Sequence, residues 1–172
     1  MLTTNQKGAI AEAKIAAAAL EIGIGVLRPL ADERYDLILD LRPRLLRVQC
    51  KWAVRRGEVV VVTCRTNRRG PGGFIWRTYD AGEIDAIAAY CSELRTCYLL
   101  PPEMSVETVT VQLRLSPTLN NQRAGINWAR DFEFAATLSR LNGPIAQLGE
   151  RDAGSVEAAG SSPAGSTGSE AA

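Results

Sequence analysis

The sequence predicts a single α/β or α+β domain in which a central mixed sheet is flanked by helices. An alanine-rich segment near the N-terminus has high helix propensity, and runs of branched and apolar residues separated by turn residues follow it. Helical and strand patterns then continue through the apolar region, and each layer needs cover from another. At 172 residues, 46% of them apolar, the chain is long enough for one domain with a buried core.

The first half of the chain is predicted to begin with a helix and to continue into an antiparallel meander. Residues 5–22 are rich in alanine and contain no proline, and Gly23 supplies the residue that ends the helix. Residues 26–30 predict a short strand. Three apolar or alternating runs separated by turn residues predict the meander: residues 36–41, 45–53 and 58–66.

The second half is predicted to contain a basic, flexible loop, a helix, two strands and a closing helix: residues 68–73, 81–94, 96–100, 106–115 and 126–141. Glycine and proline mark the loop. Apolar residues at helical spacing predict the helix over 81–94. The order of these elements gives a three-layer core.

Three polar residues are predicted to converge on one face of a hairpin. Its turn is Leu41-Arg42-Pro43-Arg44, and centring the hairpin between Arg42 and Pro43 places Asp36 opposite Gln49. Side chains two apart on a strand share a face, so Lys51 lies beside Gln49 on the side that Asp36 occupies. Asp40 shares that face by alternation and is a reserve carboxylate. The wet face of an edge strand explains the same residues about as well.

A formal net charge of +1 conceals a strongly basic segment. Residues 42–77 contain ten Lys and Arg residues against one acid, Glu58. A DNA duplex is the natural partner for that charge, because arginines on loops and strand ribbons contact phosphates and read guanine edges. A solvated meander with extended arginine side chains is the alternative. The candidate nucleic-acid contacts are Arg55, Arg56, Arg65, Arg68, Arg69 and Arg77.

The absence of histidine excludes several classes of catalytic site. Ser-His-Asp and Cys-His catalysis need a histidine base, and the usual zinc-ligand sets need histidine or paired cysteines. The four cysteines form no CxxC pair and are interpreted as buried, reduced thiols: Cys50, Cys64, Cys91 and Cys97. Carboxylate, amide and lysine chemistry on a hard metal ion remains.

No apolar run approaches the roughly 20 residues that span a bilayer, and the pattern of a secretory signal is absent. We therefore expect a soluble, cytoplasmic protein with no membrane partner.

The chain resembles the PD-(D/E)xK nuclease superfamily, and in particular the endonucleases encoded by bacterial group I introns. The resemblance begins with Gly8-x-x-x-Glu12 on a helix and covers most of residues 5–135. Its ordered motifs are Arg34-Tyr35-Asp36-Leu37, Val48-Gln49-Cys50-Lys51, Ile84-Asp85-Ala86-Ile87-Ala88-Ala89-Tyr90, Cys97-Tyr98-Leu99-Leu100-Pro101 and Ile126-Asn127-Trp128-Ala129. Two positions depart from the superfamily pattern: Tyr35 stands in place of Pro, and Gln49 stands where Glu or Asp is commonest.

The resemblance implies a restriction-endonuclease-like core and a metal-dependent, site-specific endonuclease acting on double-stranded DNA. Asp36, Glu12 and Gln49 are then the expected ligands of Mg²⁺, with Mn²⁺ as a substitute, and Lys51 completes the catalytic set. One active site per chain implies a homodimer or homotetramer, because cutting both strands needs two sites. The alternatives are a structure-specific nuclease such as a Holliday-junction resolvase, and a DNA-binding module with an inactive site.

Residues 143–172 are predicted to be a disordered, low-complexity tail behind a domain that occupies residues 1–142. The segment is rich in Gly, Ala and Ser and has almost no large apolar residues. It buries too little surface to offset the entropy of ordering it.

Translating the tail back into codons also gives nucleotide sequences that resemble parts of a transfer RNA gene. Residues 143–151 can be encoded by GGG CCC ATA GCT CAG TTG GGA GAG CGC, which is like the first arm, and residues 160–163 by GGT TCG AGT CCC, which is like the T arm. We hypothesise that the reading frame runs into an overlapping transfer RNA gene; an ordinary low-complexity tail is the alternative. Sequencing the locus decides between them, because a coding strand unable to fold into a cloverleaf there excludes the overlap.

Overall fold

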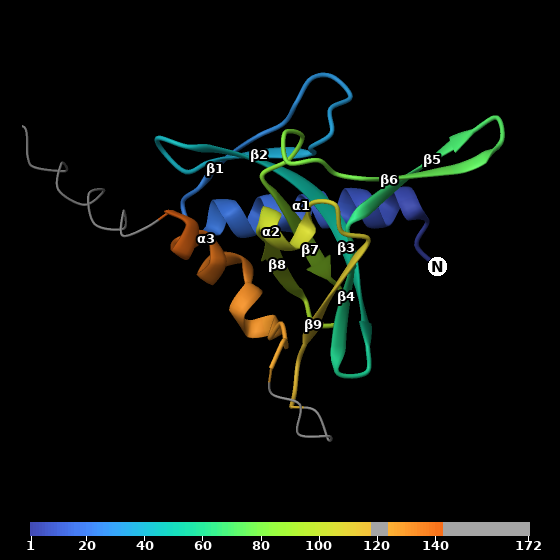
Figure 1. The fold of residues 1–172 in the computed structure, drawn as a ribbon. Coiled ribbons are helices and arrows are strands. Elements are labelled where there is room, and N and C mark those ends of the chain that lie inside the picture. The colour runs from blue at the N-terminus through green and yellow to red at the C-terminus, as the bar shows by residue number, and fades with distance from the viewer. Residues whose placement is uncertain (118–123, 143–172) are drawn as a thin grey trace, which may run out of the picture.

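The computed structural model describes residues 1–117 and 124–142 (Figure 1). The predicted tail at residues 143–172 lies outside the described residues. The elements in chain order are α1 (Thr4–Glu21), β1 (Gly25–Leu27), β2 (Leu37–Asp40), β3 (Leu45–Arg56), β4 (Val59–Thr63), β5 (Arg65–Gly70), β6 (Gly73–Thr78), β7 (Ala86–Cys91), β8 (Thr96–Leu100), α2 (Pro102–Ser105), β9 (Thr110–Arg114), the short 3-10 helix η1 (Ala129–Phe132) and α3 (Phe134–Asn142).

A seven-stranded sheet forms the centre of the described fold, and β3 is the strand on which it is built. β3 pairs antiparallel with β2 near its start and with β4 near its end, while β7 runs parallel to its middle. β1 extends the sheet beyond β2, β9 extends it beyond β4, and β8 pairs with β7. This confirms the predicted α+β class with a mixed sheet.

The β2–β3 hairpin has the register that the sequence predicts. Its ladder runs from Leu37 opposite Val48 to Asp40 opposite Leu45. The turn closes with a hydrogen bond of 2.8 Å from the backbone N–H of Leu41 to the carbonyl of Arg44. The apolar residues of each strand therefore face the core together, and the polar residues share the other face.

Helix α1 has well-defined ends. A capping box begins it, because the side chains of Thr3 and Gln6 accept hydrogen bonds from each other's backbone N–H groups. Gly23, with φ of +76°, ends it, and the N–H of Ile24 returns to the carbonyl of Ala19. Between these ends, small or branched residues four apart are buried against the sheet: Ala11, Ile15 and Ala19.

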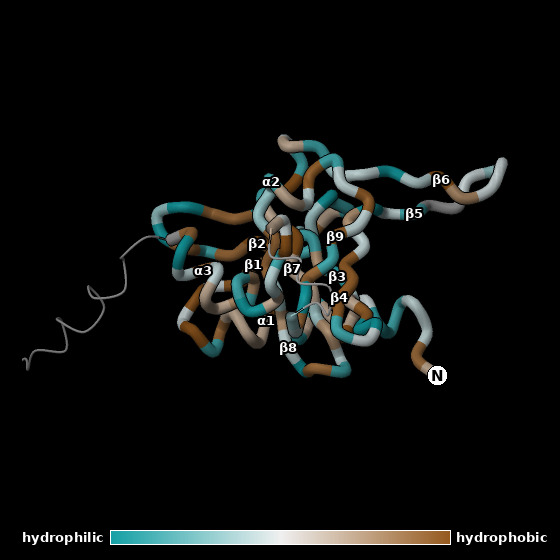
Figure 2. Tube along the Cα trace, turned by 60° about the horizontal axis from the view of Figure 1, so that its bottom comes forward, coloured by the Kyte–Doolittle hydropathy of each residue, from teal (hydrophilic) through white to brown (hydrophobic). Residues whose placement is uncertain are grey.

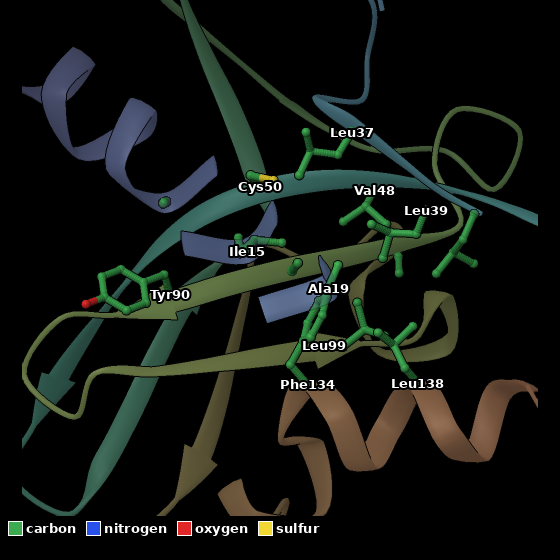
Figure 3. Close-up of a cluster of buried hydrophobic side chains, with 14 of the residues drawn as sticks. Ile15, Ala19, Leu37, Leu39, Val48, Cys50, Tyr90, Leu99, Phe134 and Leu138 are labelled. Carbon is green, nitrogen blue, oxygen red and sulfur yellow. The ribbon is translucent and has the colours of Figure 1, made fainter. Parts of the chain in front are cut away.

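Apolar side chains cover the sheet in two clusters. The first lies between the sheet and the helices α1 and α3, where Ile15, Leu37, Val48 and Leu138 meet (Figure 3). The second gathers residues of β4, β7, β8 and β9 around Tyr79. A separate two-stranded sheet, β5–β6, leaves this body as a projecting hairpin (Figures 1 and 2). We call residues 65–78 the arm.

The helix predicted over residues 81–94 is wrong, because the segment forms strand β7 instead. All six residues of β7 are buried. A central strand covered on both faces is apolar at every position, so its sequence lacks the alternation that marks a half-buried strand. The four alanines of residues 81–94 then suggest helix by propensity alone, and tertiary burial overrides that preference.

Two further expectations change. The predicted loop at residues 68–73 is the outer part of the arm, where β5 and β6 pair as far as Gly70 and Gly73. The closing helix predicted over residues 126–141 is divided into η1 and α3, and Arg114 forms an isolated bridge with Trp128 before them. Turn glycines and an exposed ribbon resemble a loop in sequence, because the ribbon has no buried face to impose alternation.

All four cysteines are free thiols; three are buried and Cys97 is partly exposed. Among the described residues, no helix has the length and apolar character needed to cross a membrane.

An ion pair fixes the start of the parallel β3–β7 pairing. The guanidinium of Arg47 donates to both carboxylate oxygens of Asp85 at 3.0 Å, and the backbone N–H of Arg47 donates to Asp85 Oδ2 at 2.8 Å. The backbone N–H of Asp85 returns to the carbonyl of Arg47 at 2.9 Å. The bonds from Arg47 hold the pKa of Asp85 below its ordinary value of 3.8.

Asp85→Asn should lower the free energy of unfolding by about 1–2 kcal/mol at pH 7. Because the folded-state pKa of Asp85 is depressed, its contribution is complete above the ordinary aspartate pKa and is lost as the pH falls through the folded value. The difference between wild type and variant should therefore shrink below about pH 4. Urea denaturation at pH 7 and pH 3 measures it, with the exposed Glu103→Gln as control. A difference that stays constant with pH would contradict this account.

Candidate active site

The site forms at the part of β3 that lies between its pairing with β2 and its pairing with β4. Its ladder with β2 ends at Val48, and its ladder with β4 begins at Val54. Among the described strands, residues 49–53 therefore pair with β7 alone. We call these residues the fork. A backbone N–H that faces an opening in a sheet needs another acceptor.

Asp36 supplies that acceptor. Its own N–H bonds the carbonyl of Val48 at 2.9 Å, just before β2 begins. Its Oδ2 accepts the backbone N–H of Cys50 at 2.7 Å and also contacts the side-chain amide of Gln49. Asp36 thus takes the place of a neighbouring strand, and the same bonds hold its carboxylate against Gln49.

Gln49 and Lys51 open with Asp36 into one cleft of about 750 Å³, the main cleft. The body of the protein contributes one wall and the arm the other. The lining includes Asp36, Gln49, Lys51, Arg34 and Tyr79 from the body and Thr66, Asn67, Ile75 and Arg77 from the arm. The structure therefore brings together three of the four candidate catalytic residues, as the hairpin register requires.

Glu12 lies on α1 beside a smaller cavity of about 180 Å³, which Asp36 also lines. Its Oε2 accepts a hydrogen bond of 2.9 Å from the guanidinium of Arg28. Asp36 connects the two cavities, since it lines both. The reserve carboxylate Asp40 is elsewhere, at the turn end of β2, where it accepts the N–H of Arg42 at 3.1 Å.

Burial shifts the pKa values of Asp36 and Lys51 in opposite directions. It raises the pKa of Asp36, the backbone N–H of Cys50 opposes that shift, and the negative charge of Glu12 adds to it. Burial also lowers the pKa of Lys51, and the charge of Asp36 opposes this shift. Each buried ion therefore favours the charged form of the other.

The donors suit a hard divalent cation in part. Asp36 offers carboxylate oxygens and Gln49 an amide oxygen, and oxygen ligands are those that Mg²⁺ prefers. In this structure the amide N–H of Gln49 faces Asp36 Oδ2, so the amide group has to turn over before its oxygen lies beside that carboxylate. Among the described residues, no three Asp, Glu, His or Cys side chains form a metal-binding group. The carboxylate of Glu12 is paired with Arg28 through Oε2. A cation there would supply charge neutralisation and an activated water.

The contacts of several residues at the site were not predicted by the sequence analysis. Arg28 holds Glu12, Tyr79 bonds Lys51, and Arg34 stacks on Tyr79 with its guanidinium carbon 4.6 Å from the ring centre. Asp32 and Glu33 line both cavities. Only the cluster of charge at residues 32–36 signals any of these positions, because the other contacts join residues far apart in the chain.

The candidate nucleic-acid residues divide between two ends of the molecule. Arg55 and Arg56 are on the β3–β4 hairpin at the bottom of Figure 1, away from the arm at the upper right. Arg55 donates to Glu58 at 3.1 Å. The remaining four belong to the arm: Arg65, Arg68, Arg69 and Arg77.

Within the arm, the arginines whose side chains are described have different surroundings. The guanidinium carbon of Arg65 lies 4.0 Å from the ring centre of Trp76. Arg77 faces the main cleft and pairs with Glu83 at 2.6 Å and with Asp80 at 3.3 Å. Phe74 and Trp76 on β6 are exposed and lie 6.3 Å apart between ring centres. The arm thus combines cationic and aromatic side chains beside the cleft.

Residues 2–135 match the family model described as PD-(D/E)XK endonuclease, and the chain belongs to this family. The class of protein that the fold and the cleft define is therefore an endonuclease. Among solved structures, the chain is similar to that of a bacterial homing endonuclease, I-Ssp6803I, with 28% sequence identity and a TM-score of 0.63. The match covers 80% of this chain and 93% of that chain. No curated protein matches the chain significantly.

Gln49→Glu should strengthen binding of a divalent cation by roughly tenfold at pH 8, because the affinity of an oxygen site rises with the charge of its ligands. Calorimetric titration of the whole chain with Mn²⁺ measures the dissociation constant. The exposed Gln112→Glu, on β9, adds the same charge away from the site and serves as control. Equal affinity in the two variants would remove Gln49 from the proposed ligands.

Proposed function

We propose that the protein is a metal-dependent, site-specific endonuclease that hydrolyses phosphodiester bonds of double-stranded DNA, in the manner of a homing endonuclease. The observation that supports this most directly is the arrangement of the main cleft. A carboxylate, an amide and a lysine line one wall, and the arginine-bearing arm lines the other. Substrate held by the arm would therefore lie against the catalytic residues.

Each residue of the cleft has a task that its chemistry suits. Asp36 and Gln49, with Glu12, are the proposed ligands of Mg²⁺, for which Mn²⁺ can substitute. Lys51 orients the attacking water and offsets the charge that develops on the phosphate. Because Gln49 is uncharged, the site holds its cation more weakly than three carboxylates would, and bound DNA then contributes to cation binding.

The arm is the proposed contact with the duplex. A two-stranded ribbon fits the major groove, where arginine reads guanine and asparagine reads adenine. β5 carries Arg65, Asn67, Arg68 and Arg69, and its partner strand carries the exposed Phe74 and Trp76. Guanidinium and aromatic groups contact phosphates and base faces, respectively.

Assembly follows from the number of active sites. One chain carries one cleft with Asp36 and Lys51, and cutting both strands of a duplex needs two. A homodimer or a homotetramer supplies them.

Cleavage of plasmid DNA in the presence of Mg²⁺ tests the proposal. Wild type should linearise a plasmid that carries the target, which selection from a randomised duplex library identifies. Asp36→Ala and Lys51→Ala should lower the cleavage rate by roughly 10³-fold or more, because they remove a cation ligand and the charge beside the phosphate. Glu103→Ala and Lys14→Ala, both exposed, are controls of matching charge change.

The outcomes separate the proposed enzyme from other proteins on this fold. Duplex binding without cleavage under any divalent ion would indicate a DNA-binding module with an inactive site. Preferential cleavage of a four-way junction over the linear duplex would indicate a resolvase. Either result would overturn the site-specific endonuclease.

Replacing Arg68 and Arg69 together by alanine should weaken duplex binding and lower the salt dependence of log K by about 2, since each phosphate contact contributes about 0.9. Titration of a labelled duplex at several salt concentrations measures this. The double variant Lys14→Ala with Arg130→Ala is the control of equal charge. Arg55→Ala with Arg56→Ala should weaken binding less, because that hairpin is away from the arm. A larger loss there would move the proposed DNA contact to the β3–β4 hairpin.

A further inference from the structure

Lys51 meets the arm at the base of both arm strands. Its Nζ donates a hydrogen bond of 2.7 Å to the hydroxyl of Tyr79 and one of 3.3 Å to the carbonyl of Arg65. Arg65 is the first residue of β5, and Tyr79 directly follows the last residue of β6. The ammonium also lies 5.0 Å from the ring centre of Tyr79. The proposed catalytic lysine is thus attached to both ends of the arm.

Tyr79 itself is held from several directions. It is only 2% exposed and belongs to the apolar cluster on the second face of the sheet. Its carbonyl accepts the backbone N–H of Glu107 at 3.0 Å. Arg34 covers its ring and also donates to the carbonyl of the preceding residue, Thr78, at 3.1 Å. The tyrosine therefore presents its hydroxyl to Lys51 from a fixed position.

A lysine near a reacting phosphate gains from such a support. Its ammonium is a compact charge on four flexible carbons, with three donors. Holding that side chain in one conformation costs conformational entropy. Contacts with neighbouring residues can fix the conformation before the substrate binds, so that binding does not have to order the side chain. Here Tyr79 and Arg65 accept from two of the three N–H groups, which leaves one for the cleft.

We propose that Tyr79 is a positioning residue, which holds the ammonium of Lys51 at the base of the arm, beside the carbonyl of Arg65. This inference rests on the proposed nuclease function. Tyr79 acts through Lys51 and needs no contact with the DNA. Of the two acceptors, Tyr79 is fixed by the core, and the carbonyl of Arg65 belongs to the first residue of β5. A shift of β5 at its base therefore moves the Arg65 carbonyl relative to a lysine that Tyr79 holds in place.

Tyr79→Phe tests the proposal, because it removes the hydroxyl and keeps the ring. We expect kcat on the selected duplex to fall by about 10- to 100-fold, with KM and the dissociation constant measured in Ca²⁺ nearly unchanged. Tyr98→Phe is the matched control, since Tyr98 is also buried, at 3% exposure, in the same cluster. A kcat for Tyr79→Phe that equals that of Tyr98→Phe, or a loss confined to KM, would overturn the proposal.

A second measurement keeps the test independent of cleavage and of how Tyr79→Phe folds. Fluorine NMR of the full chain with 3-fluorotyrosine at position 79 reports the surroundings of the ring. Lys51→Met should shift this resonance, while Lys14→Met should leave it in place; an unmoved resonance in Lys51→Met would overturn the contact. If wild type and Lys51→Ala cleave DNA equally, the proposed function fails instead, and the resonance still decides whether Tyr79 holds Lys51.

Discussion

The hydrogen bond between the carboxylate of Asp36 and the backbone N–H of Cys50 is the interaction on which the site depends. Strand β3 leaves β2 after Val48 and reaches β4 only at Val54, so the fork between them has an unpaired edge. An orphaned backbone donor in a buried sheet is costly, and the carboxylate removes that cost. The same opening lets the side chains of Gln49 and Lys51 reach the main cleft. The carboxylate of Asp36 therefore has two roles: it accepts the backbone N–H of Cys50, and it is a proposed cation ligand. Both roles depend on the fork, where no strand pairs with this edge of β3.

The charges around the fork are balanced in pairs. Glu12 is joined to Arg28, and the charge of Lys51 lowers the pKa of Asp36 against the larger effect of burial. In the proposed endonuclease, a divalent cation entering alone would add positive charge beside these pairs, whereas a cation accompanied by a phosphodiester would bring a compensating negative charge. As a proposed ligand, the neutral amide of Gln49 would strengthen that dependence, because it would supply an oxygen without adding charge. In the proposed endonuclease the pairing would thus favour joint binding of cation and DNA.

Local rules predict the parts of this protein that are local. The turn at residues 41–44 and strand alternation were enough to place Asp36, Gln49 and Lys51 on one face, since a hairpin register follows from its turn. β7 could not be recognised, because a strand buried on both faces carries no alternation. The bonds of Lys51 with Tyr79 and of Glu12 with Arg28 span 28 and 16 residues, and no periodicity reports such contacts. The count of charged residues over 42–77 likewise left out Asp80, Glu83 and Asp85, which follow that segment and pair with its arginines.

Those acids give the basic segment its internal order. Asp85 binds Arg47 at the start of the β3–β7 pairing, and Glu83 binds both Arg34 and Arg77 at the base of the arm, so the chain itself supplies the counter-charges of these three arginines. The base of the arm is therefore fastened to the body through ion pairs and through Tyr79, while Phe74 and Trp76 on β6 stay exposed. Lys51 belongs to the fork of β3, and its ammonium donates hydrogen bonds to Arg65 and Tyr79 at the two ends of the base of the arm. The side chain of Lys51 therefore connects the fork directly with the base of the arm.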